Sequence, residues 1–409
     1  MAFVVSLFLV FIGCASDSVA PPAIPAPAEQ PQTPSAAVLL PVAAEYSPGP
    51  TNCPPETLPV PAGRVVLGQE GGDAGRDEQP VHTVLLDGFC LDRTEMMDPS
   101  GARSQVFDGW SEAREACVAR GGRLPTEAEF EKAARGGCEL GSDPEHCDKG
   151  DMRIYPWGDA PPTCALANHS MVSPRGPQRC SQGPGKGDAL AAGAGPYGHL
   201  NLAGNLWEPT EDWYHPKVYR TDRPKNPGGP SEGRSKALRG GAWDTFSTNM
   251  RISNRFSDHI KGSSIGARCV FGGATPTVES VDPLEWVNVQ LLVRMKNGEA
   301  ISGRWLTVTA FHETDMDRSG LPKPGISPLS EGGVVPSGAR NQTISLAVPK
   351  GERVRFSAAL DSGKAPSGPM PAAASGGIAW AEKGVVAEDG VSITLMVAPL
   401  PSHPHSPRP

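Results

Sequence analysis

The chain has 409 residues, which is enough for two or three domains, one of them with a sizeable buried core. Glycine (48 residues) and proline (44) together exceed a fifth of the sequence, and hydrophobic residues make up only 38%. This composition predicts many turns and loops and argues against a helical bundle. The net charge of −8 and the lack of a basic block argue against a nucleic-acid partner.

Residues 1–14 have the features of an export signal. An apolar run from Phe3 to Ile12 is too short to span a bilayer and is followed by a small residue and Cys14. This resembles a bacterial lipobox, in which the peptide is cut before a cysteine that then carries a lipid. We therefore expect a membrane anchor at Cys14 and a location in the cell envelope, with the outer membrane favoured by Ala15. The alternative is an ordinary signal peptide that contains a cysteine, and export follows from either.

The next two segments differ sharply in composition. Residues 15–52 are rich in proline and alanine and are expected to form an extended linker. Residues 53–273 hold most of the tryptophans and cysteines, which indicates a compact but irregular domain. Eight cysteines remain besides Cys14 and none forms a C-x-x-C pair, so zinc-knuckle and thioredoxin-like sites are not expected. An even number of cysteines in an exported chain predicts disulfides.

Residues 284–398 are expected to form a small all-β, sandwich-like domain. A strand is predicted by four alternating apolar residues, Val287, Val289, Leu291 and Val293. The following Asn297-Gly298 predicts a type I′ hairpin turn. A second hairpin is predicted around Lys350-Gly351, where the alternating residues are Ile344, Leu346, Val348, Val354 and Phe356. Residues 399–409 are expected to be a disordered tail.

Two helices are predicted in the first domain. The segment Gly122–Glu131 begins a helix whose first turn Thr126 can cap, while Glu129 can reach back to the N–H of Thr126. Gly136 fits the left-handed position that ends a helix. Residues 111–120 form the other predicted helix, which carries Cys117 on its apolar face.

Several motifs then follow one another in a definite order: Gly122–Glu131, Tyr155–Gly158, Asn201–Glu208, Arg239–Trp243 and Ile265–Cys269. In this order they resemble the formylglycine-generating enzyme (sulfatase-modifying factor) family over residues 58–272. The resemblance implies an α+β fold, an irregular C-type-lectin-like mixture of short strands, two helices and long loops. Between Glu95 and Trp110 the chain is shorter than in the family, which implies that the family's first helix is missing or replaced.

The resemblance also implies a disulfide between Cys117 and Cys269. Closing a loop of about 150 residues stabilises a fold by on the order of 4–5 kcal/mol through the entropy of the unfolded chain. For the other six cysteines, nearness in sequence favours three pairs, although sequence does not fix connectivity: Cys53–Cys90, Cys138–Cys147 and Cys164–Cys180.

A structural calcium site is implied by the motif Asn201–Glu208. The resemblance assigns as ligands the side chains of Asn201 and Glu208 and the backbone carbonyls of Gly204 and Leu206. Hard oxygen donors from one tight loop are the ligands that Ca²⁺ prefers. The alternative is that Asn205 and Glu208 only tie the loop by hydrogen bonds while Trp207 fills the core.

The family's oxidase chemistry depends on two cysteines that bind Cu(I) shortly after the Gly-Gly-x-Trp motif. Soft thiolates are the ligands that Cu(I) selects, but here no cysteine occurs between Gly241 and Cys269. We therefore expect no copper and no catalytic residues of that kind. A related branch binds non-haem iron through closely spaced histidines, and this chain has no H-x-x-x-H pair.

The leading hypothesis is an envelope-anchored, non-oxidase member of the family: a calcium-stabilised module that binds a protein or a glycan. The alternative is an enzyme of the formylglycine-generating or non-haem-iron superfamily whose catalytic residues are unidentified. Its polar candidates are Asp244, Arg251 and Arg255, although both arginines also fit a role in bracing the loop. A third possibility is a purely structural envelope protein.

Overall fold

The structure is a computed structural model that describes residues 46–71, 73–144, 147, 152–171, 178–220, 225–257, 264–279, 284–301, 305–316, 322–323, 326, 328–334, 338–361, 377–380, 384–388 and 390–397. The expected anchor at Cys14, most of the linker and the C-terminal tail lie outside these residues. Within them the chain forms two α-helices, α1 (Trp110–Ala119) and α2 (Glu127–Arg135), and twenty mostly short strands. None of the described helices is long and apolar enough to cross a bilayer. The chain thus has the mixed α and β character expected, with few helices.

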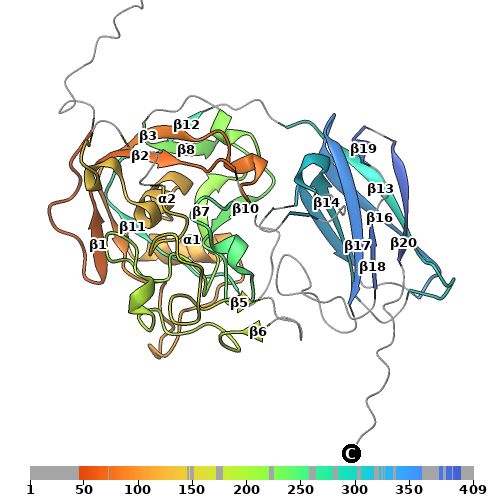
Figure 1. The fold of residues 1–409 in the computed structure, drawn as a ribbon, viewed down its shortest axis with the longest axis horizontal. Helices are drawn as coiled ribbons and strands as arrows, with labels where there is room; N and C mark the ends of the chain where they lie inside the picture. Colours follow the sequence, from red (N-terminus) through yellow and green to blue (C-terminus); the bar gives the residue numbers. More distant parts are fainter. Residues whose placement is uncertain are drawn as a thin grey trace, which may run out of the picture. The chain divides into compact units, whose positions relative to one another are not determined.

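The part of the chain before residue 280 contains five small sheets around α1 and α2 (Figure 1). Two of them have three strands, in the orders β1-β4-β11 and β10-β9-β7. The other three are the pairs β2-β3, β5-β6 and β8-β12. The strands are β1 (Thr57–Val60), β2 (Gly63–Leu67), β3 (His82–Leu86), β4 (Phe89–Asp92), β5 (Ser170–Met171), β6 (Gln178–Arg179), β7 (Glu208–Trp213), β8 (Pro227–Pro230), β9 (Lys236–Arg239), β10 (Phe256–Ser257), β11 (Val270–Phe271) and β12 (Thr277–Glu279).

Helix α2 is buried along its whole length, although five of its nine residues carry charge. Its N-terminus has the predicted capping box, in which Thr126 Oγ1 accepts from the N–H of Glu129 at 3.1 Å and the Glu129 carboxylate accepts from the N–H of Thr126 at 2.8 Å. Gly136 ends the helix with a φ of 90°. A buried charge is costly unless it is paired. The helix therefore fits the interior only because arginines from distant strands meet its acids.

The central ion pairs of α2 involve Glu131. Its carboxylate accepts from Arg239 Nη2 at 2.5 Å and from Arg135 Nη2 at 2.8 Å, and all three side chains are at least 96% buried. Tyr219 donates a third hydrogen bond from its hydroxyl at 2.8 Å. The two guanidinium groups hold the pKa of Glu131 below its usual value despite the opposing effect of burial. These pairs join α2 to β9 inside the core.

Helix α1 also follows its predicted pattern, with Ala113 and Cys117 buried on one face. A disulfide joins Cys117 to Cys269, 152 residues further along the chain, and both residues are fully buried. The other three disulfides join the pairs that nearness in sequence favours: Cys53–Cys90, Cys138–Cys147 and Cys164–Cys180. The segment between Glu95 and Trp110 contains turns and no helix, as its short length implies.

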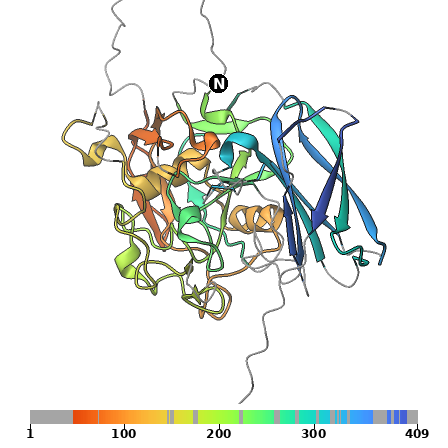
Figure 2. The same cartoon turned by 45° about the vertical axis from the view of Figure 1, so that its right-hand side comes forward.

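The described residues after 284 form strands and one 3₁₀ turn, Glu313–Asp315. One sheet has the order β16-β13-β20 and the other the order β15-β14-β17-β18, with β19 also paired to β17. Figure 2 shows these strands, in teal and blue, from a second direction. Apolar side chains from both sheets form one cluster, to which Val289 and Val308 contribute. The strands are β13 (Trp286–Met295), β14 (Trp305–His312), β15 (Ser330–Val334), β16 (Asn341–Pro349), β17 (Arg353–Asp361), β18 (Gly377–Trp380), β19 (Val385–Val386) and β20 (Ser392–Val397).

Both predicted hairpins are wrong, although the strands themselves are present. After Asn297-Gly298 the chain leaves β13 and enters β14, which lies in the other sheet, and only Gly298 of this pair has a positive φ. After Lys350-Gly351 it likewise passes from β16 to β17 in the other sheet. Strands β13 and β16 pair with each other over nine residues instead. A period-two pattern shows which face is buried but not which strand lies alongside, and two facing sheets bury the same apolar faces.

Candidate functional site

The loop Asn201–Trp207 is shaped by residues with left-handed backbone conformations. Asn201, Gly204 and Asn205 have φ values of 55°, 80° and 65°. A Cβ atom at Gly204 would lie 2.5 Å from the backbone oxygen of Asn168, so the close approach of these two segments requires glycine. Trp207 is fully buried and packs against Phe256 with ring centroids 5.2 Å apart.

The predicted calcium ligands all lie in or beside this loop and are buried. The Glu208 carboxylate faces Arg268, whose Nε and Nη2 each donate to it at 2.9 Å. The side-chain amide of Asn201 donates to Glu95 at 2.9 Å and to the backbone oxygen of Gly187 at 3.1 Å. Among the hydrogen bonds of the described residues, none reaches the backbone oxygens of Gly204 and Leu206. No donor among the described residues therefore competes with a cation for these two carbonyls.

Glu95 is a member of this site that the sequence did not single out. It is fully buried and accepts hydrogen bonds from the amides of Asn201 and Asn205 and from the Ser104 hydroxyl at 2.9, 3.0 and 3.3 Å. Burial, with a further contribution from the nearby charge of Glu208, raises the pKa of Glu95 to about 7. No local sequence pattern points to Glu95, because its partner Asn201 lies 106 residues further along the chain.

The donors of this loop fit a calcium ion in chemical type. Glu95 and Glu208 together carry two negative charges when ionised. Arg268, which interacts with both, supplies one positive charge. A carboxylate oxygen has two lone pairs, so Glu208 can keep Arg268 and still bind a cation. The alternative to a calcium site is that Asn205 and Glu208 only tie the loop by hydrogen bonds. Such bonds are present: Asn205 bonds to Gly185 and Glu95, and Glu208 bonds to Arg268.

The segment after Gly241 contains the residues that the enzyme hypothesis named. Arg251 donates to Glu78 at 2.6 and 2.7 Å, and Arg255 donates to Glu127 at 2.8 and 2.5 Å. Both guanidinium groups are buried in these ion pairs, which matches the role of bracing the loop. Asp244 accepts a hydrogen bond from Ser264 at 3.0 Å.

A cavity of about 180 Å³ lies beside the loop. Its lining includes both Asn201 and Asn205 and is otherwise formed by Cys164, Asn168, Cys180, Ser181, Gly185, Lys186, Ala189 and Leu190. Asn168 donates from its amide to Asn205 at 3.0 Å and accepts from the Ser181 hydroxyl at 2.7 Å. Amide and hydroxyl groups both donate and accept hydrogen bonds, and Lys186 adds a cationic donor, so this lining suits a polar ligand.

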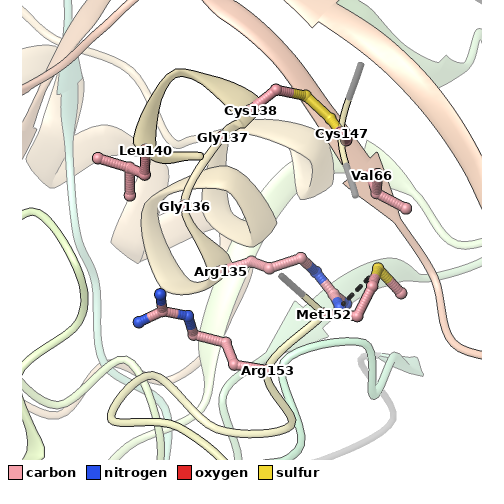
Figure 3. Close-up of a pocket in the computed structure, with 9 residues that line it drawn as sticks. All are labelled: Val66, Arg135, Gly136, Gly137, Cys138, Leu140, Cys147, Met152 and Arg153. Carbon is pink, nitrogen blue, oxygen red and sulfur yellow. Dashed lines mark hydrogen bonds between the residues drawn. A yellow bond between two sulfur atoms is a disulfide. The ribbon is translucent and has the colours of Figure 1, made fainter. Parts of the chain in front are cut away.

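A second hollow, shown in Figure 3, lies between the end of α2 and the Cys138–Cys147 disulfide. Its volume of about 50 Å³ is close to the space that one or two water molecules occupy. Arg135, which points across it toward Met152, is already bonded to Glu131 and to the backbone oxygen of Gly68. This hollow is therefore too small for a ligand of the usual size.

Comparison with known proteins identifies the family. Residues 106–272 match the sulfatase-modifying factor enzyme 1-like domain. The formylglycine-generating enzyme of Streptomyces coelicolor is 31% identical over 199 residues, which are 42% of this chain and 56% of that protein. The hercynine oxygenase of Mycolicibacterium thermoresistibile is 37% identical over 145 residues, which are 34% of this chain and 29% of that protein. Among solved structures, PvdO from Pseudomonas aeruginosa aligns at 18% identity with a TM-score of 0.40, over 52% of this chain and 93% of its own.

The chain spans roughly half the length of the formylglycine-generating enzymes that it matches, 56% and 59% in the two bacterial examples. The matched part includes the buried helix α2, the loop Asn201–Trp207 and the disulfide Cys117–Cys269. Residues 106–272 therefore form a domain of the sulfatase-modifying factor and formylglycine-generating enzyme family.

Proposed function

We propose that this protein is a non-oxidase member of its family: a calcium-stabilised, C-type-lectin-like module that is anchored at the cell envelope and binds a protein or a glycan. The proposal that the protein is not an oxidase depends on one observation: no cysteine occurs between Gly241 and Cys269. A Cu(I) site needs soft donors, and the hydroxyl groups of Thr245 and Ser247 are hard ligands. Cys269 offers no thiolate while it is bonded to Cys117.

Calcium stabilisation is supported by the charge balance around the loop. Two fully buried carboxylates, Glu95 and Glu208, face one guanidinium group, and two backbone carbonyls of the loop accept no hydrogen bond from the described residues. Burial is the main cause of the raised pKa of Glu95, and the charge of Glu208 adds to it, so a divalent cation beside these carboxylates would favour their ionised forms. The ion's role in this proposal is to hold the loop that borders the cavity.

The binding role is supported by the 180 Å³ cavity, whose amides and hydroxyl suit the hydroxyl groups of a sugar or the backbone of a peptide. The rival enzyme hypothesis has less support, because the two arginines that it named are held in buried ion pairs. Envelope anchoring remains a proposal based on the residues around Cys14.

Gly185→Ala tests the binding role. A Cβ atom at Gly185 would lie 3.6 Å from Asn205 Oδ1, an ordinary contact, so the variant should fold while its methyl group narrows the cavity. Gly183→Ala is the matched control, because a Cβ atom there meets nothing within 4 Å and the residue does not line the cavity. Saturation-transfer NMR against a panel of mono- and disaccharides and short peptides should show binding by the wild type and the control, and weaker binding by Gly185→Ala. Equal binding by all three proteins, or none by the wild type, would contradict this role for the cavity.

A further inference from the structure

The disulfide Cys164–Cys180 differs from the other three in its position. Of the eight paired cysteines, all of which the structure describes, only Cys164 is exposed; Cys180 is half-buried. Both residues line the cavity of about 180 Å³. By contrast, Cys117 and Cys269 are fully inaccessible. An attacking thiolate needs access to one sulfur atom, and Cys164 is the more exposed of the two residues that form this bond.

The partner sulfur is in contact with a buried imidazole. His169 Nδ1 lies 3.5 Å from Cys180 Sγ and 3.1 Å from the backbone oxygen of Ala167. A carbonyl oxygen only accepts hydrogen bonds, so we assign the ring proton to Nδ1, from where it also points toward the sulfur. Burial keeps the pKa of His169 below its ordinary value, so the ring is neutral at neutral pH and acts as a hydrogen-bond donor.

One cationic side chain borders the cavity that Cys180 lines. Lys186 lines the cavity together with the two cysteines and forms an exposed ion pair with Asp188 at 3.2 Å. A hydrogen-bond donor and nearby cations both favour a thiolate over a thiol. Asp188 pairs with Lys186, so the hydrogen bond from His169 is the main support for a thiolate at Cys180.

We propose that the Cys164–Cys180 disulfide is a thiol–disulfide exchange site, in which a peptide thiolate attacks the sulfur of the exposed Cys164 and Cys180 leaves as a thiolate next to His169. The new bond joins the incoming sulfur to Cys164, and the electron pair of the old bond stays on Cys180. A second peptide thiolate then attacks the incoming sulfur, which gives an oxidised peptide disulfide and the reduced Cys164/Cys180 pair. The disulfide itself is the two-electron oxidant, so one turnover needs no further reactant.

The asymmetry of the bond sets the direction of attack. The rate of exchange depends on access to the attacked sulfur and on the stability of the leaving thiolate. Cys164 supplies the access, and the environment of Cys180 supplies the stabilised leaving group. This activity is separate from the ligand binding proposed above, because it needs a thiol and the binding does not.

The first experiment uses reduced glutathione as the peptide thiol and the full-length oxidised protein. After a short exposure, free thiols are blocked with N-ethylmaleimide and the protein is mapped by mass spectrometry without reduction. The expected product carries glutathione on Cys164 and the blocking group on Cys180, while Cys53–Cys90 stays intact as an internal control. Equal labelling at Cys53, or glutathione only on Cys180, would overturn the proposal.

The second experiment tests the role of His169 as a positioning residue. In Cys164→Ser the Cys180 thiol is free, and its rate of alkylation by iodoacetamide against pH should give a pKa below the usual value of about 8.5. Adding His169→Phe should raise that pKa, and His169→Phe alone should slow glutathione attack on Cys164 by about threefold or more. His169→Asn, whose amide can replace the N–H donor, should recover part of the rate. A Cys180 pKa at or above the usual value, or no effect of His169→Phe on either measurement while Cys117–Cys269 remains oxidised, would refute this role.

Discussion

Asn201 donates a hydrogen bond from its side-chain amide to the carboxylate of Glu95 at 2.9 Å, across 106 residues of sequence. This contact joins the loop Asn201–Trp207 to the residues that follow β4, and it brings a second buried acid to within range of Glu208. The resulting cluster has more negative than positive groups, which makes it sensitive both to cations and to pH.

Calcium should stabilise the wild-type protein, and Glu208→Gln should remove most of that effect. A ligand that binds only the folded state raises its stability by mass action, by about 2.7 kcal/mol at a concentration one hundred times its Kd. Thermal unfolding with increasing calcium, and with a chelator, measures the shift in Tm. Asp98→Asn is the control, because Asp98 is a partly exposed acid whose side-chain partners, Ser100, Ala102 and Arg103, all lie in its own turn. A calcium-free wild-type protein with a Tm that calcium does not change would rule out the site.

Glu95→Gln should change how the stability of the calcium-free protein depends on pH. The pKa of Glu95 is raised from 4.5 to about 7, so the folded state holds one extra proton between these values. The stability that protonated Glu95 contributes to the folded state is fully present below pH 4.5 and is lost as the pH rises through 7. Urea unfolding in chelator should therefore show the wild type losing about 3 kcal/mol relative to Glu95→Gln between pH 4.5 and 7.5. His199, whose pKa burial lowers to about 3, acts in the opposite direction but is common to both proteins. Parallel stability curves for the two proteins would contradict the prediction.

Arg239→Met should destabilise the protein by about 3–5 kcal/mol, because it leaves the buried Glu131 with only part of its compensating charge. Urea unfolding at pH 7 measures the loss. Arg114→Met is a matched control at the surface: its pair with Glu211 spans 3.3 Å, but the Arg114 side chain is 45% exposed. This control should change the free energy of unfolding by less than about 1 kcal/mol. Similar losses in the two variants would show that burial does not determine the cost.

The purified protein should leave the cysteine of a sulfatase-motif peptide without conversion to an aldehyde, even with copper and oxygen. Mass spectrometry of the peptide distinguishes the aldehyde from the thiol and from a disulfide, which separates this reaction from thiol exchange. Copper-dependent aldehyde above a no-protein control would place the ligands elsewhere in the chain and end the non-oxidase proposal.

Cys14→Ser should move the protein from the detergent-soluble membrane fraction to the soluble exported fraction. The apolar run before Cys14 and the proline-rich segment after it motivate this prediction. Fractionation followed by immunoblotting measures it, with an exported protein lacking a lipid signal as control. An unchanged distribution would exclude lipid anchoring at Cys14.

The sequence predicted those features that depend on nearby residues. The capping box of Thr126 and Glu129 and the buried face of α1 are local patterns, and the structure has both. The pairing of β13 with β16 was missed because alternation does not determine the neighbouring strand. Glu95 was missed for a related reason: its partners come from distant loops, and an isolated acid gives no sign of its burial.

The complete burial of α2 has a consequence for how this family can diverge. Each acid on the helix is matched to a base on another segment, as Glu127 is to Arg255 and Glu131 to Arg239. Replacing one member of such a pair leaves its partner without its full compensating charge. Both residues of the pair must therefore change together if stability is to be kept. Genetic drift through single steps is therefore nearly closed at these positions, while exposed turns elsewhere in the domain are free to vary. A short sequence motif centred on α2 can in this way stay recognisable in a chain that has no cysteine between Gly241 and Cys269.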